Sequence, residues 1–179
     1  MNTEYNLKIT DEVTHHFNDI LHNSKIPNET EVIISAENLI LELKECHLED
    51  YVISHIYTLK VLINMLSDSN WSISTSHKNY ILSALQYFVQ TDDVIPDNIP
   101  VVGLLDDCIV IDIVKNRLTN ELDDYLDFSQ TAKIYAHDKN YSVDDWKETK
   151  RKEVYSRLRH RRNSAIRNRR SRGTSFSIF

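Results

Sequence analysis

Four aspartates near the middle of the chain have the residue type and the close spacing of a hard-cation site. They lie in the stretch DDVIPDNIPVVGLLDDC, residues 92–108, which also holds two of the three prolines and one of the two glycines. Carboxylate oxygens are ligands that Mg²⁺ and Ca²⁺ take in proteins. One hypothesis is therefore a metal-dependent enzyme whose ligands would be Asp93, Asp97, Asp106 and Asp107. The spacing differs from that of an EF-hand loop, which needs an Asp-x-Asp-x-Asp-Gly run and a terminal Glu.

The same stretch also has a structural interpretation that needs no ligand. A residue before proline is pushed out of the α region, so Ile95 and Ile99 should be extended or turn-like. Asp106 and Asp107 fall in the first turn of the following helix, where a negative charge stabilises by about 0.3–1 kcal/mol. We favour this interpretation and expect no bound metal, no cofactor and no catalytic residue. The structural motif would then consist of Asp93, Pro96, Asp97, Pro100, Gly103, Asp106 and Asp107.

The order of these residues resembles a known family signature. Tyr87, the two prolines, the glycine and the four aspartates match it in register. The stretch is similar to the YkvA-like domain of unknown function, the bacterial DUF1232-type family, over about Ser83 to Leu118. The Ser-Pro pair of the signature is Gln90-Thr91 here, and its aromatic residue is Asn98. The resemblance implies a small helical fold without a settled activity. Members are often taken as membrane-associated, but the helix that follows the motif here carries Asp112, Lys115, Arg117 and Glu121.

The C-terminal part of the chain carries most of its positive charge. Residues 147–172 contain 12 Lys and Arg but only 2 Asp and Glu, whereas residues 1–146 contain 9 basic and 25 acidic residues. Distributed arginines suit contacts to phosphates that do not read bases. The arm is expected to bind nucleic acid or a nucleoprotein complex through Arg157, Arg159, Arg161, Arg162, Arg167, Arg169, Arg170 and Arg172. An acidic protein, an anionic membrane surface or simple solvation of the arm are the alternatives.

Other residues of catalytic type give no pattern for a site. The eight histidines are scattered, and a body with one glycine cannot form a Gly-rich phosphate loop. Cys46 and Cys108 lack metal-ligand spacing and form no disulfide framework, which favours a reducing cytoplasm. The first residues show no signal peptide, and no apolar run is long enough to span a membrane.

The elements that must position these residues are predicted to be helices. Apolar residues recur at helical spacing, and glycine and proline are rare. We expect an all-α compact bundle of about five to six helices with a basic C-terminal helix. The expected helices cover about 11–22, 28–46, 48–66, 76–90, 104–128 and 131–137, and the last follows a capping signal at Ser142 and Asp145.

The charge pattern predicts two parts, an acidic bundle of residues 1–146 and a basic helix and tail of residues 147–179. The last helix has an apolar stripe that is expected to dock its first turns on the body, formed by Trp146, Val154, Leu158 and Ala165. The sequence thus favours a cytoplasmic binding or regulatory protein over an enzyme, and it assigns no oligomeric state.

Overall fold

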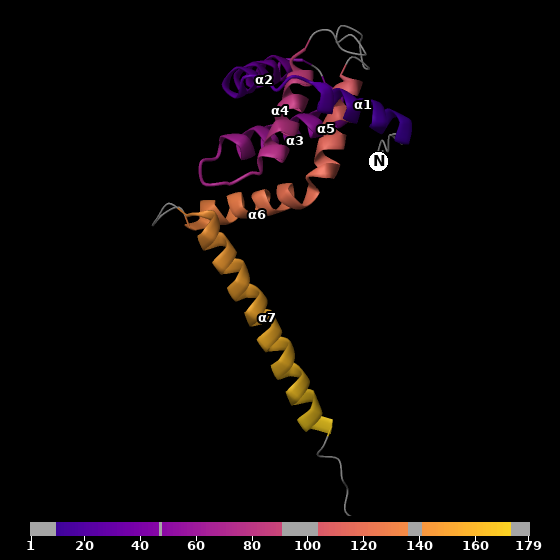
Figure 1. The fold of residues 1–179 in the computed structure, drawn as a ribbon. Helices are drawn as coiled ribbons and strands as arrows, with labels where there is room; N and C mark the ends of the chain where they lie inside the picture. Colours follow the sequence, from indigo (N-terminus) through magenta and orange to yellow (C-terminus); the bar gives the residue numbers. More distant parts are fainter. Residues whose placement is uncertain (1–9, 47, 91–103, 136–140, 173–179) are drawn as a thin grey trace, which may run out of the picture. The chain divides into compact units, whose positions relative to one another are not determined.

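The computed structural model describes residues 10–46, 48–90, 104–135 and 141–172, with side chains up to Ser164. Within these residues the fold is all-α, as predicted, and contains no strand (Figure 1). The described part has seven helices rather than five to six. They are α1 (Asp11–Asn23), α2 (Glu29–Leu43), α3 (Asp50–Ser67), α4 (Thr75–Phe88), α5 (Leu105–Arg117), α6 (Thr119–Tyr135) and α7 (Val143–Arg172).

The chain divides into two compact units, Met1–Asp127 and Phe128–Phe179. The boundary lies inside α6, so the first unit holds α1 to α5 with the start of α6. The second unit holds the end of α6 and all of α7. The division expected after residue 146 rests on charge alone and stays a prediction.

Several helices begin at caps that the local sequence encodes. The side chain of Asn28, predicted as a cap, accepts hydrogen bonds from the backbone N–H groups of Thr30 and Glu31 at the start of α2. Ser142 and Asp145 form the predicted reciprocal pair at the start of α7. The Asp145 N–H donates to the Ser142 hydroxyl at 3.2 Å, and the Ser142 N–H donates to the Asp145 carboxylate at 3.0 Å. Such caps satisfy backbone donors that have no partner within the helix.

The core of the first unit lies between α3, α4 and α5. Helix α5 packs against α3 and α4, while α4 also packs against α1 and α2. Leu59 and Leu62 on α3 are fully buried, as are Ile81 and Leu85 on α4. Helix α3 was expected to be apolar on most faces, and it buries seven apolar side chains. These helices form the support against which the start of α5 is held.

The helix predicted over residues 104–128 is instead two helices that meet at Leu118, and the short helix predicted near residues 131–137 is the end of α6. The backbone of Leu118 leaves the helical region, with φ −107° and ψ 17°. The Thr119 hydroxyl donates to the carbonyl groups of Lys115 and Asn116, at 2.9 and 3.0 Å. A hydroxyl bound to a carbonyl of the preceding turn favours bending of a helix. The apolar stripe continues through the break, so spacing alone did not reveal it.

An aromatic cluster forms the core of the second unit. Phe128 on α6 stacks on Tyr141 with ring centroids 6.3 Å apart, and it meets Trp146 of α7 edge to face at 6.4 Å. Tyr135 stacks on Tyr141 at 5.4 Å. Among the described side chains of the stripe predicted to dock α7, Trp146 is buried, whereas Val154 and Leu158 are more than half exposed. The docking prediction is therefore correct for the first turn of α7 and wrong for the later turns.

Candidate functional site

The acidic motif is described only in its last part. Asp93, Pro96, Asp97, Pro100 and Gly103 lie outside the described residues. Asp106 and Asp107 lie in the first turn of α5, as predicted. Their exposed fractions are 1% and 2%, so both carboxylates are buried in the first unit. A buried carboxylate must be compensated by hydrogen bonds or charge, and the positive end of the helix macrodipole supplies part of that compensation.

A tyrosine of α4 holds one of the two carboxylates. The Tyr87 hydroxyl donates a hydrogen bond to Oδ2 of Asp106 at 2.9 Å, and the tyrosine ring meets Phe17 of α1 edge to face. The contact therefore links α1, α4 and the start of α5. Tyr87 was noted in the sequence for its place in the motif, and the structure gives it the role of orienting Asp106.

Replacing Tyr87 by phenylalanine is expected to lower the free energy of unfolding by about 1.5–3 kcal/mol, because a hydrogen bond to a buried charged group is lost. Urea denaturation followed by circular dichroism measures the change. The matched control is Tyr155→Phe, since Tyr155 is an exposed tyrosine of α7. Equal stability of the Tyr87 variant and the unmutated chain would contradict a structural role for this contact.

The structure does not assemble a metal site from the residues it describes. Among them, no group of three or more His, Cys, Asp or Glu side chains is arranged to hold a metal ion. The four-aspartate hypothesis also needs Asp93 and Asp97, which lie outside the described residues. The structure therefore leaves this hypothesis a prediction.

A cluster formed by His55 of α3 with Cys108 and Asp112 of α5 was not predicted from the sequence. Nε2 of His55 lies 3.1 Å from Oδ2 of Asp112, and Nδ1 of His55 lies 2.6 Å from the carbonyl oxygen of Tyr51. Burial lowers the pKa of His55, but hydrogen bonds with Asp112, Cys108 and the Tyr51 backbone outweigh it and raise that pKa to about 10. His55 is therefore an imidazolium that donates from both ring nitrogens and ties α3 to α5.

The cluster contains the residue types of a nucleophilic catalytic site, but its cysteine is not accessible to a substrate. Cys108 has an exposed fraction of 4%, so a substrate cannot approach its thiol in this structure. Cys108 and Asp112 lie one helical turn apart on α5, but His55 comes from α3, more than fifty residues earlier in the chain, so no local spacing indicated the cluster. We assign it a structural role.

The contribution of His55 to stability is expected to depend on pH. Its folded pKa, about 10, exceeds the ordinary value of 6.5. The contribution is therefore fully present below about pH 6.5 and is lost as pH rises through about 10. Because Asp112 is more than a third exposed, we expect only about 1 kcal/mol. The test compares His55→Gln with the unmutated chain by urea denaturation at pH 6 and pH 10. A stability difference that is equal at both pH values would refute the assignment.

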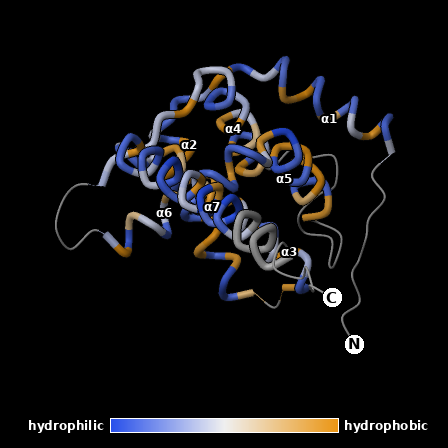
Figure 2. The backbone as a smooth tube through the Cα atoms, turned by 90° about the horizontal axis from the view of Figure 1, so that it is seen from below, coloured by the Kyte–Doolittle hydropathy of each residue, from blue (hydrophilic) through white to orange (hydrophobic). Residues whose placement is uncertain are grey.

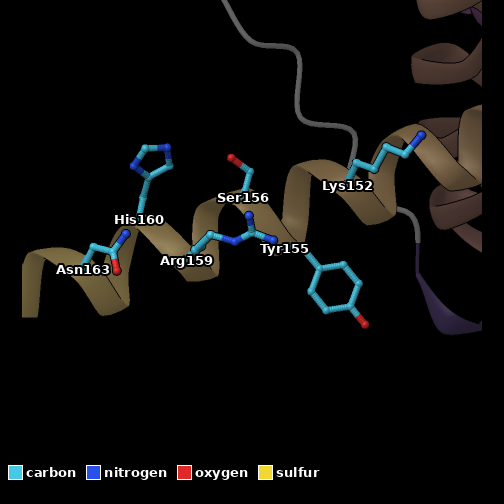
Figure 3. A pocket seen from close by; sticks show the side chains of 6 residues that line it. All are labelled: Lys152, Tyr155, Ser156, Arg159, His160 and Asn163. Carbon is cyan, nitrogen blue, oxygen red and sulfur yellow. The ribbon is translucent and has the colours of Figure 1, made fainter.

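The basic arm is a continuous helix whose described cations are exposed, apart from the half-buried Lys150. Side chains from Arg151 to Ser164 are all exposed, and Figure 3 shows those of Tyr155 and His160 projecting from opposite sides of α7. In Figure 2 the tube of α7 is coloured mainly as hydrophilic, whereas hydrophilic and hydrophobic residues alternate along α5. Arg167, Arg169, Arg170 and Arg172 also lie on α7, and their side chains are outside the described set.

The cations of α7 fall into two groups, which differ in whether acidic residues of the same helix pair with them. In the first group each cation pairs with an acid of the same helix. Lys147 pairs with Asp144 at 3.9 Å, Lys150 with Glu153 at 3.7 Å, and Glu148 with both Arg151 at 3.2 Å and Lys152 at 3.7 Å. No acidic residue follows Glu153 in the sequence. The described arginines beyond this point, Arg157, Arg159, Arg161 and Arg162, thus have no acid on their own helix within the next turn.

Comparison with known proteins identifies the segment around the acidic motif. Residues 78–112 match the family described as Protein of unknown function (DUF1232). The resemblance stated from the motif is confirmed. The DUF1232 segment runs from α4 to α5, and so contains Tyr87, Asp106 and Asp107. Neither a curated protein nor a solved structure matches the chain.

The DUF1232 segment contributes side chains to two polar contacts that join helices of the first unit. The hydrogen bond between Tyr87 and Asp106 and the pair of His55 with Asp112 both involve its side chains. The four described arginines beyond Glu153 lie outside the segment. Within the part of the chain described here, no helix has the length and apolar character needed to cross a bilayer.

Proposed function

We propose that the protein is a non-enzymatic binding or regulatory protein that attaches through α7 to nucleic acid or to a nucleoprotein complex. The observation that carries this proposal is the group of exposed arginines beyond Glu153, Arg157, Arg159, Arg161 and Arg162, which no acid of the following turns neutralises. Cations of this kind release counterions from a nucleic-acid backbone when they contact its phosphates, which gives affinity without base recognition.

The length and the charge of α7 both support this proposal. The arginine-bearing part, residues 157–172, lies within one helix and extends over about 23 Å at 1.5 Å per residue. Double-stranded DNA carries one negative charge per about 1.7 Å of its axis, so several phosphates lie within reach of such a helix. The acidic residues 1–146 repel the same phosphates. Attachment is therefore expected through the arm and not through the first unit.

The location proposed for this activity is the cytoplasm. The two cysteines are free, and Cys46 is exposed. Free thiols are typical of a reducing compartment. The DUF1232 segment would then support the fold and offer a surface for regulation, while α7 supplies the attachment.

The proposal is tested by fluorescence anisotropy with the full chain, a labelled DNA duplex, a labelled single-stranded RNA, and a labelled acidic peptide of equal charge. We expect saturable binding of both nucleic acids at low salt, little sequence preference, and weaker binding of the peptide. Absence of binding to either nucleic acid would refute the proposal. Preferential binding of the peptide, or of anionic vesicles in a flotation assay, would favour the adaptor alternatives.

A further inference from the structure

An exposed stripe on α3 has the spacing of a helix-pairing seam. Ile53 and Tyr57 are 52% and 63% exposed, although the opposite side of the same helix is buried in the core. With Asp50, Lys60 and Asn64 they recur at intervals of three, four, three and four residues. Residues so spaced lie on one face of a helix and form the contact line when two helices pair. We define Asp50, Ile53, Tyr57, Lys60 and Asn64 as the α3 seam.

The apolar centre of the α3 seam is a ridge with a groove on either side. Ile53 and Tyr57 line a groove of about 540 Å³ together with Val61, Leu122 and Leu126. They also line a second groove, with Leu43, Leu48 and Ile56. All these residues belong to the first unit. Helices pack by placing the ridge of one into the groove of the other. The surface thus carries both halves of a helix-packing contact.

The charges at the two ends of the seam indicate the partner. Asp50 lies three residues before Ile53, and Lys60 lies three residues after Tyr57. Neither makes an ion pair with another of the described residues. If a second α3 runs antiparallel, Ile53 lies opposite the partner's Tyr57, and Asp50 lies opposite the partner's Lys60. A parallel arrangement would bring like charges together. The seam is therefore self-complementary under a two-fold axis, as a symmetric dimer interface requires.

We propose that the α3 seam pairs two copies of this chain, antiparallel and about a two-fold axis. The proposal does not rest on nucleic-acid binding, although a dimer would present two α7 helices and so increase avidity for one nucleic acid. The ridge of each copy then fills a groove beside the ridge of the other copy.

The test uses the full chain after nuclease treatment, so that bound nucleic acid cannot bridge two copies. Analytical ultracentrifugation measures mass against concentration. We expect a concentration-dependent rise from 21.0 kDa to about twice that mass. If the chain is still entirely monomeric at a protein concentration of about 100 μM, its affinity for a second copy is too weak for a functional dimer, and the proposal is overturned.

Charge reversals identify the surface and the orientation. Asp50→Lys alone and Lys60→Asp alone each place like charges opposite each other, and each should raise the dimer dissociation constant by about ten-fold. Combining both in one chain restores opposite charges and should restore dimerisation. Asp19→Lys on the exposed face of α1 is the matched control and should change nothing. The antiparallel seam would be refuted if the single reversals left the dimer dissociation constant unchanged. It would also be refuted if the double variant did not restore dimerisation.

A contact between the basic α7 of one copy and the acidic first unit of another would also produce a dimer. The variant with Arg157, Arg159, Arg161 and Arg162 replaced by glutamine separates the two cases. The α3 seam predicts that this variant dimerises as well as the unmutated chain. Loss of dimerisation in it would assign the interface to α7 and overturn the proposal.

Discussion

Replacing Arg157, Arg159, Arg161 and Arg162 by glutamine is expected to weaken nucleic-acid binding by about 10²-fold near 0.1 M salt. The four side chains are distributed around α7, so about half of them can contact one duplex at a time. Each lost phosphate contact removes about 0.9 from the slope of log affinity against log salt, which at 0.1 M is close to a ten-fold loss in affinity. Fluorescence anisotropy with one labelled duplex measures both quantities.

The matched control removes the same charge from the other group of cations on α7. Replacing Lys147, Lys150, Arg151 and Lys152 by glutamine leaves the four arginines beyond Glu153 in place. Because these cations already pair with Asp144, Glu148 and Glu153, we expect a smaller loss, below about ten-fold. Equal losses in the two variants would mean that only total charge matters. Unchanged binding in the first variant would contradict the role assigned to the four arginines.

Replacing Trp146 by alanine is expected to have the largest effect on the stability of the second unit. Trp146 is 8% exposed and packs edge to face on Phe128, which is itself buried. Removing a buried Trp or Phe side chain costs about 3–5 kcal/mol. Among the described residues of the second unit, only Phe128 is buried besides Trp146, so the aromatic cluster should lose its packing.

Amide hydrogen exchange locates this effect. Protection should fall over residues 141–160 in the Trp146 variant and stay unchanged in α3 and α4. Tyr155→Ala is the control, because Tyr155 is 61% exposed on the same helix, and a surface substitution changes stability by less than about 0.5 kcal/mol. Similar exchange in the two variants would show that Trp146 does not hold the start of α7.

Sequence reasoning succeeded where the cause of a feature is local. The Asn28 cap and the Ser142–Asp145 pair depend on residues within one turn, and the structure contains both. The placement of Asp106 and Asp107 in a first helical turn also follows from local patterning. The all-α class follows from apolar spacing and the scarcity of glycine and proline, which act along the whole chain.

Sequence reasoning failed where the structure depends on a competing hydrogen bond or on a residue far away in the chain. At Leu118 the apolar stripe continues, while the Thr119 hydroxyl binds the carbonyls that a continuous helix would leave to backbone N–H groups. The pair of His55 with Asp112 forms only because α3 packs against α5. The stripe of α7 predicted docking at Val154 and Leu158. However, Arg157 and Arg159 flank Leu158, and Arg151 and Arg157 lie about one turn from Val154, which leaves little continuous apolar surface to bury.

The most direct test of the central proposal is the salt dependence of nucleic-acid binding by the full chain. Anisotropy titrations of one duplex at about five salt concentrations give the slope of log affinity against log salt. Attachment through α7 predicts a straight line with a slope of about −2 or steeper, reduced by about two in the variant that lacks Arg157, Arg159, Arg161 and Arg162. A slope near zero, or an equal slope in that variant, would contradict attachment through the arginines of α7.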